Sequence, residues 1–83
     1  MHSRFMRPPE VARLQGVTRQ HIYHEVKLGR WPPPVKIGRV ASGWLESEVV
    51  AMRNAQLAGV PEEELKALVL DLVSKRTAEE VAS

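Results

Sequence analysis

The run Trp31-Pro32-Pro33-Pro34 constrains the fold of this chain more than any other feature. Proline has no backbone N–H and a fixed φ, so it is excluded from helix interiors and from central strands. The run therefore predicts a rigid connector between two parts of the chain. Because the chain has only 83 residues, both parts must pack around one compact core. Aromatic residues make up only 5% of the sequence, so Trp31 and Trp44 are expected to supply much of that core.

Two helices are predicted before the connector, over residues 8–15 and 18–28. Two prolines open the first helix, where a missing N–H costs nothing. Gly16 suits the tight turn that ends it, because glycine tolerates the left-handed conformation. Thr18 is expected to cap the second helix, since its hydroxyl can accept a hydrogen bond from an N–H two or three residues on. Gly29 is the natural end of that helix.

A small hairpin is predicted after the connector. Residues 35–37 alternate apolar and basic side chains, as a half-buried strand does. Gly38-Arg39 offers a tight turn, and residues 40–42 a short return strand. Gly43 is expected to weaken the second strand. Because an isolated hairpin is marginally stable in water, this one must lean on the helices.

Two more helices are predicted in the second half of the chain, over residues 45–58 and 61–76, and residues 77–83 are expected to fray. The second begins with a proline and three glutamates, which suit the positive end of the helix dipole. Its apolar residues form one stripe, which predicts either packing on the domain or pairing with a second copy. The stripe consists of Leu65, Leu68, Val69, Leu72 and Val73.

Charge is distributed unevenly along the chain. Residues 1–53 contain nine Lys or Arg against four Glu, a net charge of +5, whereas residues 54–83 contain three basic and six acidic residues, a net charge of −3. A basic first part is typical of a surface that meets an anionic polymer, and a solvated surface of mixed charge is the alternative.

Composition excludes several classes of protein. The absence of cysteine rules out disulfide scaffolds and thiolate metal sites. No apolar run approaches the roughly 18–20 residues that a membrane-spanning helix needs, and the first residues do not resemble a signal peptide. A cytoplasmic protein is therefore expected.

Residues 11–22 have the pattern of a helix-turn-helix. The motif needs a small residue where the helices cross, a turn residue that accepts positive φ, and apolar residues on the inner faces. Ala12, Gly16, Val17 and Ile22 meet these needs, with Val11 as a further apolar anchor. Two positions depart from the pattern, because Gln15 and Glu25 stand where apolar residues are common. Gln15 suits an exposed helix end, and Glu25 can turn outward if Val26 takes over the packing. The alternative is an ordinary pair of helices in a small bundle.

The outer face of helix 18–28 is rich in side chains suited to DNA. Arginine can hydrogen-bond a guanine twice and glutamine can do so with an adenine, which suggests such roles for Arg19 and Gln20, and Arg19 could instead bind a phosphate. Lys27 is suited to a phosphate, as is the start of the helix. On the hairpin, Lys36 and Arg39 are placed to reach the backbone or the minor groove. The candidate DNA-binding residues are Thr18, Arg19, Gln20, His21, Tyr23, His24, Lys27, Lys36 and Arg39.

Some of these side chains have a second interpretation. Tyr23 is equally suited to the edge of the core. His21 and His24 lie one turn apart and could bind a metal with Glu25 or His2, but two histidines make an incomplete site, so no metal or other cofactor is expected. The acidic pair Glu46 and Glu48 is explained by the helix dipole rather than by catalysis.

Four stretches of the chain, taken in order, carry a family resemblance. They are Arg4-Phe5-Met6-Arg7-Pro8-Pro9-Glu10-Val11, Gly16-Val17-Thr18-Arg19-Gln20-His21-Ile22-Tyr23, Lys27-Leu28-Gly29-Arg30-Trp31-Pro32 with Pro34-Val35-Lys36-Ile37-Gly38, and Gly43-Trp44-Leu45-Glu46-Ser47-Glu48-Val49. Together they resemble the AlpA family of prophage regulators, which is related to excisionases and to MerR-like winged helix-turn-helix domains. The resemblance implies a mostly α fold with a small β-hairpin, a winged helix-turn-helix, over 1–59. The extra C-terminal helix over 60–76 and a disordered tail over 77–83 lie outside the resemblance and are predicted from the residues themselves. The resemblance has two departures, Glu25 and a wing with fewer charges than in some relatives.

The resemblance and the outer face together predict a sequence-specific DNA-binding transcriptional regulator of prophage or mobile-element type. Helix 18–28 would lie in the major groove and the wing, 35–43, on the backbone or in the minor groove. For some members the family implies a role in excision. Double-stranded DNA, a second copy on the DNA and a recombinase or integrase are the expected partners, and no membrane is expected.

A protein-interaction adaptor acting through helix 61–76 is the alternative, because it would explain the acidic second part and the apolar stripe. An enzyme finds little support. The sequence has no nucleophile–base spacing, no glycine-rich phosphate loop and no complete set of metal ligands.

Overall fold

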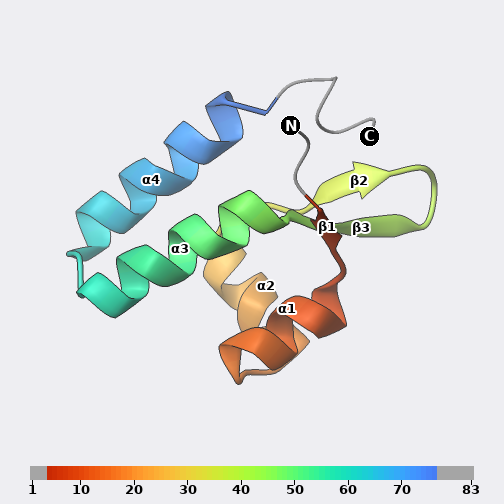
Figure 1. Ribbon diagram of the computed structural model, residues 1–83, viewed down its shortest axis with the longest axis horizontal. Helices are drawn as coiled ribbons and strands as arrows, with labels where there is room; N and C mark the ends of the chain where they lie inside the picture. The colour runs from red at the N-terminus through yellow and green to blue at the C-terminus, as the bar shows by residue number, and fades with distance from the viewer. Residues whose placement is uncertain (1–3, 77–83) are drawn as a thin grey trace.

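The computed structural model describes residues 4–76 (Figure 1). Within them the chain forms a mostly helical domain with a small antiparallel sheet. The predictions for the tail 77–83 and for His2 lie outside the described residues. The elements are β1 (Phe5–Met6), α1 (Pro8–Gln15), α2 (Arg19–Lys27), β2 (Val35–Ile37), β3 (Ala41–Leu45), α3 (Glu46–Ala58) and α4 (Glu62–Ser74).

The four helices lie where the sequence predicts them, with bounds that differ by at most two residues. Gly16 ends α1 in the left-handed conformation, with φ at 70°, which explains why a glycine occupies this turn. Thr18 caps α2, because its Oγ1 accepts a hydrogen bond of 3.0 Å from the backbone N–H of His21. The C-terminal end of α1 and the N-terminal end of α2 are thus determined by residues of the turn between them.

The sheet has three strands in the order β1-β3-β2, all antiparallel. The prediction of a hairpin alone is therefore incomplete, because β1 pairs with β3 through Phe5 opposite Leu45 and Met6 opposite Trp44. The hairpin turn is also one residue longer than predicted. Val40 belongs to the turn, where it is 95% exposed, and the return strand begins at Ala41.

β3 continues through Gly43, where the sequence predicts a weak strand. The strand runs through it to Leu45, and β1 crosses at this point. A Cβ on Gly43 would overlap the backbone oxygen of Met6 and lie 2.9 Å from Cζ of Phe5. Glycine is therefore what lets β1 pair with the strand, since close backbone approach leaves no room for a side chain.

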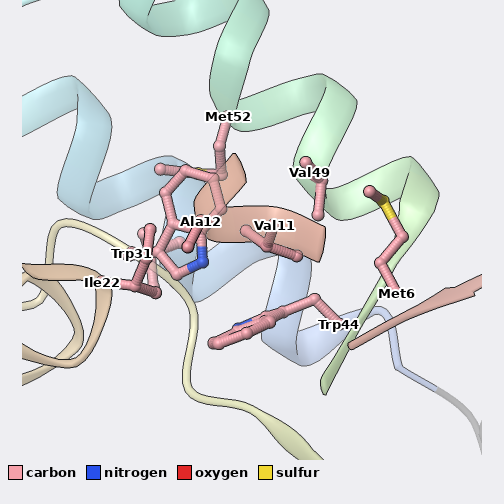
Figure 2. Packing of buried hydrophobic residues seen from close by; sticks show 9 residues of the cluster. Met6, Val11, Ala12, Ile22, Trp31, Trp44, Val49 and Met52 are labelled. Atoms are coloured by element: carbon pink, nitrogen blue, oxygen red, sulfur yellow. The ribbon is translucent and has the colours of Figure 1, made fainter. Parts of the chain in front are cut away.

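The core is built around the two tryptophans, as the sequence predicts. Trp44 and Trp31 are 0% and 2% exposed, and their rings meet edge to face with centroids 6.5 Å apart. The indole Nε1 of Trp44 donates a hydrogen bond of 2.7 Å to the backbone oxygen of Pro32, so the core holds the connector as well. Figure 2 shows the cluster of buried residues around the two rings, which includes Met6, Val11, Ala12, Ile22, Val49 and Met52.

Helix α4 lies alongside α3 (Figure 1) and turns its apolar stripe to this same core. Val69 is 5% exposed, and the other four stripe residues pack against the cluster as partly buried side chains. Of the two alternatives for the stripe, packing on the domain is what the structure shows. Leu70, outside the stripe, is 72% exposed.

The two departures from the helix-turn-helix pattern both have polar partners. Gln15 is half-buried, not exposed as expected, and its Nε2 donates a hydrogen bond of 2.8 Å to Oε1 of Gln56. Val26 packs against the core, as the sequence analysis required, and the Glu25 carboxylate accepts two hydrogen bonds from the Arg30 guanidinium, at 3.0 and 2.7 Å. This fork from Arg30 lowers the pKa of Glu25 below its ordinary value, against the opposing effect of burial.

Substituting Gly43 with alanine is expected to lower the free energy of unfolding by about 2 kcal/mol, because the new Cβ overpacks the crossing of β1 and β3. Chemical denaturation followed by tryptophan fluorescence measures the loss. The matched control is Ser42→Ala in the same strand, which should change stability by less than about 0.5 kcal/mol. Equal effects of the two substitutions would show that β1 does not press on Gly43.

Glu25→Gln is expected to cost about 1–2 kcal/mol of unfolding free energy at pH 7, because the charged hydrogen bonds to Arg30 are lost. The carboxylate has a lower pKa folded than unfolded, so its contribution is complete above the ordinary glutamate pKa of about 4.3 and is lost as pH falls below it. Denaturation of both proteins between pH 7 and pH 3 should show their stability difference shrinking. A difference that stays constant over this range would contradict the account.

Candidate nucleic-acid interface

The two faces of α2 have different roles in the structure. Its inner face places Ile22, 2% exposed, in the core, and Val26 packs beside it. The outer side chains predicted as site residues are all exposed. They are Arg19, Gln20, His21, Tyr23, His24 and Lys27. The α1–α2 packing thus leaves a polar, hydrogen-bonding surface open on one side of the helix.

Arg19 and Lys27 are the two Lys or Arg residues predicted as site residues on this face. Across residues 4–76, neither Arg19 nor Lys27 forms an ion pair, and the first turn of α2 contains no acidic residue. By contrast, Arg4, Arg30 and Arg76 are paired with carboxylates at 2.6–3.4 Å. The face therefore keeps its positive charge available to an anion at a helix N-terminus, where the dipole also favours negative charge.

Tyr23 fits both interpretations that the sequence left open. Its side chain is 41% exposed, and its ring lies 6.1 Å from that of Trp44, tilted by 46°. One side of the ring thus rests on the core while the remainder faces outward. An open hollow beside it is lined by Gln20, Tyr23, His24, Val26 and Lys27.

The β2–β3 hairpin carries the other two predicted site residues. Lys36 is exposed opposite Ser42, and Arg39 is exposed in the turn, which projects beyond the helices (Figure 1). Within the described chain neither cation has an ion-pair partner. The contact between Tyr23 and Trp44 joins α2 to β3, so the strand that carries the hairpin is attached to the helix through these rings.

The histidines of α2 do not form part of a metal cluster in the described chain. No group of three or more His, Asp or Glu residues between positions 4 and 76 is arranged to hold a metal ion. Glu25, a possible third ligand from the sequence, is bound to Arg30 instead.

Glu46 and Glu48 lie in the first turn of α3, as expected for residues that favour the helix dipole, but each also has an arginine partner. Glu46 accepts a hydrogen bond of 3.4 Å from Arg4. Glu48 is only 3% exposed and is paired with Arg76 at 2.6 Å. The dipole alone is therefore an incomplete explanation, because the burial of Glu48 depends on a charge that arrives from the end of α4.

A second hollow, which the sequence analysis did not predict, lies between β1, α1 and α3. It is lined by Arg4, Met6, Glu10, Arg13, Leu14, Glu46, Val49 and Val50. Arg4 Nη2 donates a hydrogen bond of 2.8 Å to Glu10, which lowers the pKa of that carboxyl. The residues that form this hollow are far apart in sequence, so no local pattern signals it.

Arg7 and Arg13 are further exposed cations that the sequence analysis did not select. In the described part of the chain neither has an ion-pair partner. The charge count of residues 1–53 includes both, but charge alone does not tell which face of the protein a cation occupies. As for membranes, none of the helices between residues 4 and 76 is long and apolar enough to cross a bilayer.

Comparison with known proteins places this arrangement in a family. The model of the family described as prophage CP4-57 regulatory protein (AlpA) matches residues 4–52. The uncharacterized protein ORF88 of Enterobacteria phage P4 is 43% identical over 56 residues, which are 68% of this chain and 64% of that protein. The chain thus spans less than two thirds of this relative's length. No solved structure matches the chain.

The matched segment runs from β1 into α3 and ends before α4. It includes both helices of the motif, the connector and the hairpin, with every candidate DNA-binding residue among them. Since it makes up more than half of the chain, the protein belongs to the AlpA family of prophage regulatory proteins.

Proposed function

We propose that this protein is a sequence-specific DNA-binding regulator of prophage or mobile-element type. In this account α1 and α2 are a helix-turn-helix, α2 is the recognition helix, and the β2–β3 hairpin is the wing. The observation that carries the proposal is the outer face of α2, which is polar and whose cations Arg19 and Lys27 have no ion-pair partner within the described chain. Membership of the AlpA family of prophage regulatory proteins supports the same conclusion.

The recognition helix enters the major groove with its first turn toward the base edges. Arg19 and Gln20 follow the Thr18 cap directly, which gives them the shortest reach to the bases. Arg19 is suited to a guanine and Gln20 to an adenine. His21 in the same turn, and Tyr23 and His24 in the next, are available to bases or phosphates.

Phosphate contacts fix the protein on the duplex. Lys27, at the last turn of the recognition helix, binds the backbone. Lys36 and Arg39 of the wing reach an adjacent stretch of backbone or the minor groove. Such contacts supply affinity and position without discriminating between sequences. A protein that binds chromosomal or prophage DNA in this way acts at the nucleoid, in the cytoplasm.

A domain of this size makes few base contacts, so one copy binds weakly on its own. We infer that the regulator acts as two or more copies on adjacent half-sites, or together with a recombinase in an excision complex.

The adaptor alternative has lost its main support, because the stripe of α4 contacts the chain's own core.

Selection from a pool of random duplexes should yield a defined site. On that site Arg19→Ala is expected to weaken binding by about 1–3 kcal/mol and to relax the preference at one base pair, because a base contact is lost. Arg39→Ala should weaken binding to all sequences alike and lower the slope of log K against log salt by about 1.

Lys75→Ala is the control for loss of one cation, since Lys75 is exposed at the C-terminal cap of α4 and pairs with Asp71 of that helix. It should leave affinity, preference and salt slope unchanged. Fluorescence anisotropy over a series of salt concentrations measures all three. If no duplex is enriched, or if binding does not weaken with salt, the protein is not a DNA-binding regulator of this kind.

A further inference from the structure

Helix α4 lies outside the segment that matches the AlpA family, yet it is fastened at both ends to the proposed DNA-binding unit. At its first turn, Glu62 accepts a hydrogen bond of 3.2 Å from Arg30, directly after the recognition helix. Beyond its last turn, Arg76 binds Glu48 of α3 through a fork, with distances of 2.6 and 2.9 Å. The two ends of α4 are therefore hydrogen-bonded to different parts of the domain.

Both attachments act on the connector between the recognition helix and the wing. Arg30 immediately precedes the connector, and Arg76 Nη2 donates a hydrogen bond of 2.8 Å to the backbone oxygen of Pro33 within it. From the other side, Trp44 Nε1 holds the backbone oxygen of Pro32. The connector thus lies between β3 and the end of α4, with adjacent carbonyl groups bound to different elements.

The polar attachments concern geometry more than stability. The apolar stripe already joins α4 to the core, whereas a buried ion pair adds little net stability, because desolvation offsets most of the attraction. Glu48 is only 3% exposed, so this cost is substantial. What a bidentate fork does supply is a fixed distance and orientation.

The departure at Glu25 fits the same arrangement. An apolar residue is common at this position of a helix-turn-helix, and here Glu25 binds Arg30, which in turn binds Glu62 of α4. Lys66, one turn further along α4, also pairs with Glu62 at 3.1 Å. These ion pairs connect the recognition helix to α4, because Arg30 binds both Glu25 and Glu62.

We propose that α4 is a positioning element for DNA binding: by holding the connector, it sets the placement of the wing relative to the recognition helix. Arg76 is the main positioning residue, and it touches no DNA itself. This inference rests on the proposed function, because it concerns the two elements that contact DNA.

A double-mutant cycle on the full chain tests the inference, with affinity for the selected duplex as the readout. In the wild-type background Arg39→Ala should weaken binding about fivefold and lower the salt slope by about 1. In the Arg76→Ala background the wing is misplaced, so Arg39→Ala should cost less than about twofold and leave the slope unchanged. A purely structural role of Arg76 would lower affinity without this coupling to the wing.

Lys75→Ala, one residue away, is the matched control, and in its background Arg39→Ala should cost the full amount. If Arg76→Ala is not folded at the assay temperature, as a missing cooperative unfolding transition would show, Arg76→Lys replaces it in the double-mutant cycle. Lysine keeps a positive charge beside Glu48 and lacks the fork. Coupling in either cycle supports the inference. If the Arg39→Ala effect is the same in the folded Arg76 variant as in wild type, the inference is wrong and the DNA-binding function stands. Failure of the wild type to bind any duplex would refute both.

Discussion

The rest of the structure depends on the contacts of one buried side chain, the indole of Trp44. Its ring packs edge to face on Trp31 and supports Tyr23 of α2, and its Nε1 binds the backbone of the proline connector. One side chain of β3 thus touches the helix and the connector at once. Since β3 pairs with both β1 and β2, the sheet and the helix pair form one body around this residue.

This packing explains how so small a chain can present a polar face. The inner side of α2 packs on the core, so its polar side chains are exposed, except for Glu25, which is half-buried and binds Arg30. Four glutamates of the described chain bind other cations: Glu25 and Glu62 bind Arg30, Glu48 binds Arg76, and Glu10 binds Arg4. Positive charge therefore remains on α2 and on the hairpin, which is what an interface for a polyanion requires.

Local chemistry made the helices predictable, and long-range contacts could not be predicted in the same way. Gly16 and Thr18 specify their turn and cap by themselves, so the bounds of α1 and α2 follow from the sequence. Strand β1 is not predictable because two residues show no periodicity. The role of Gly43 is not predictable for a different reason, because it depends on a strand nearly forty positions away. The outer face of α2 was predictable from its residue types. No local spacing pattern predicts the ion pair Glu48–Arg76, because its residues are 28 positions apart.

The central claim is that one continuous surface, formed by the outer face of α2 and the tip of the hairpin, receives DNA. Mapping the backbone amides of the isotope-labelled chain by NMR during titration with its selected duplex tests this most directly. The account predicts that the largest chemical-shift changes fall on residues 18–27 and 36–40, with small changes along α4. Changes centred on the hollow between β1, α1 and α3, with the outer face of α2 unaffected, would contradict it.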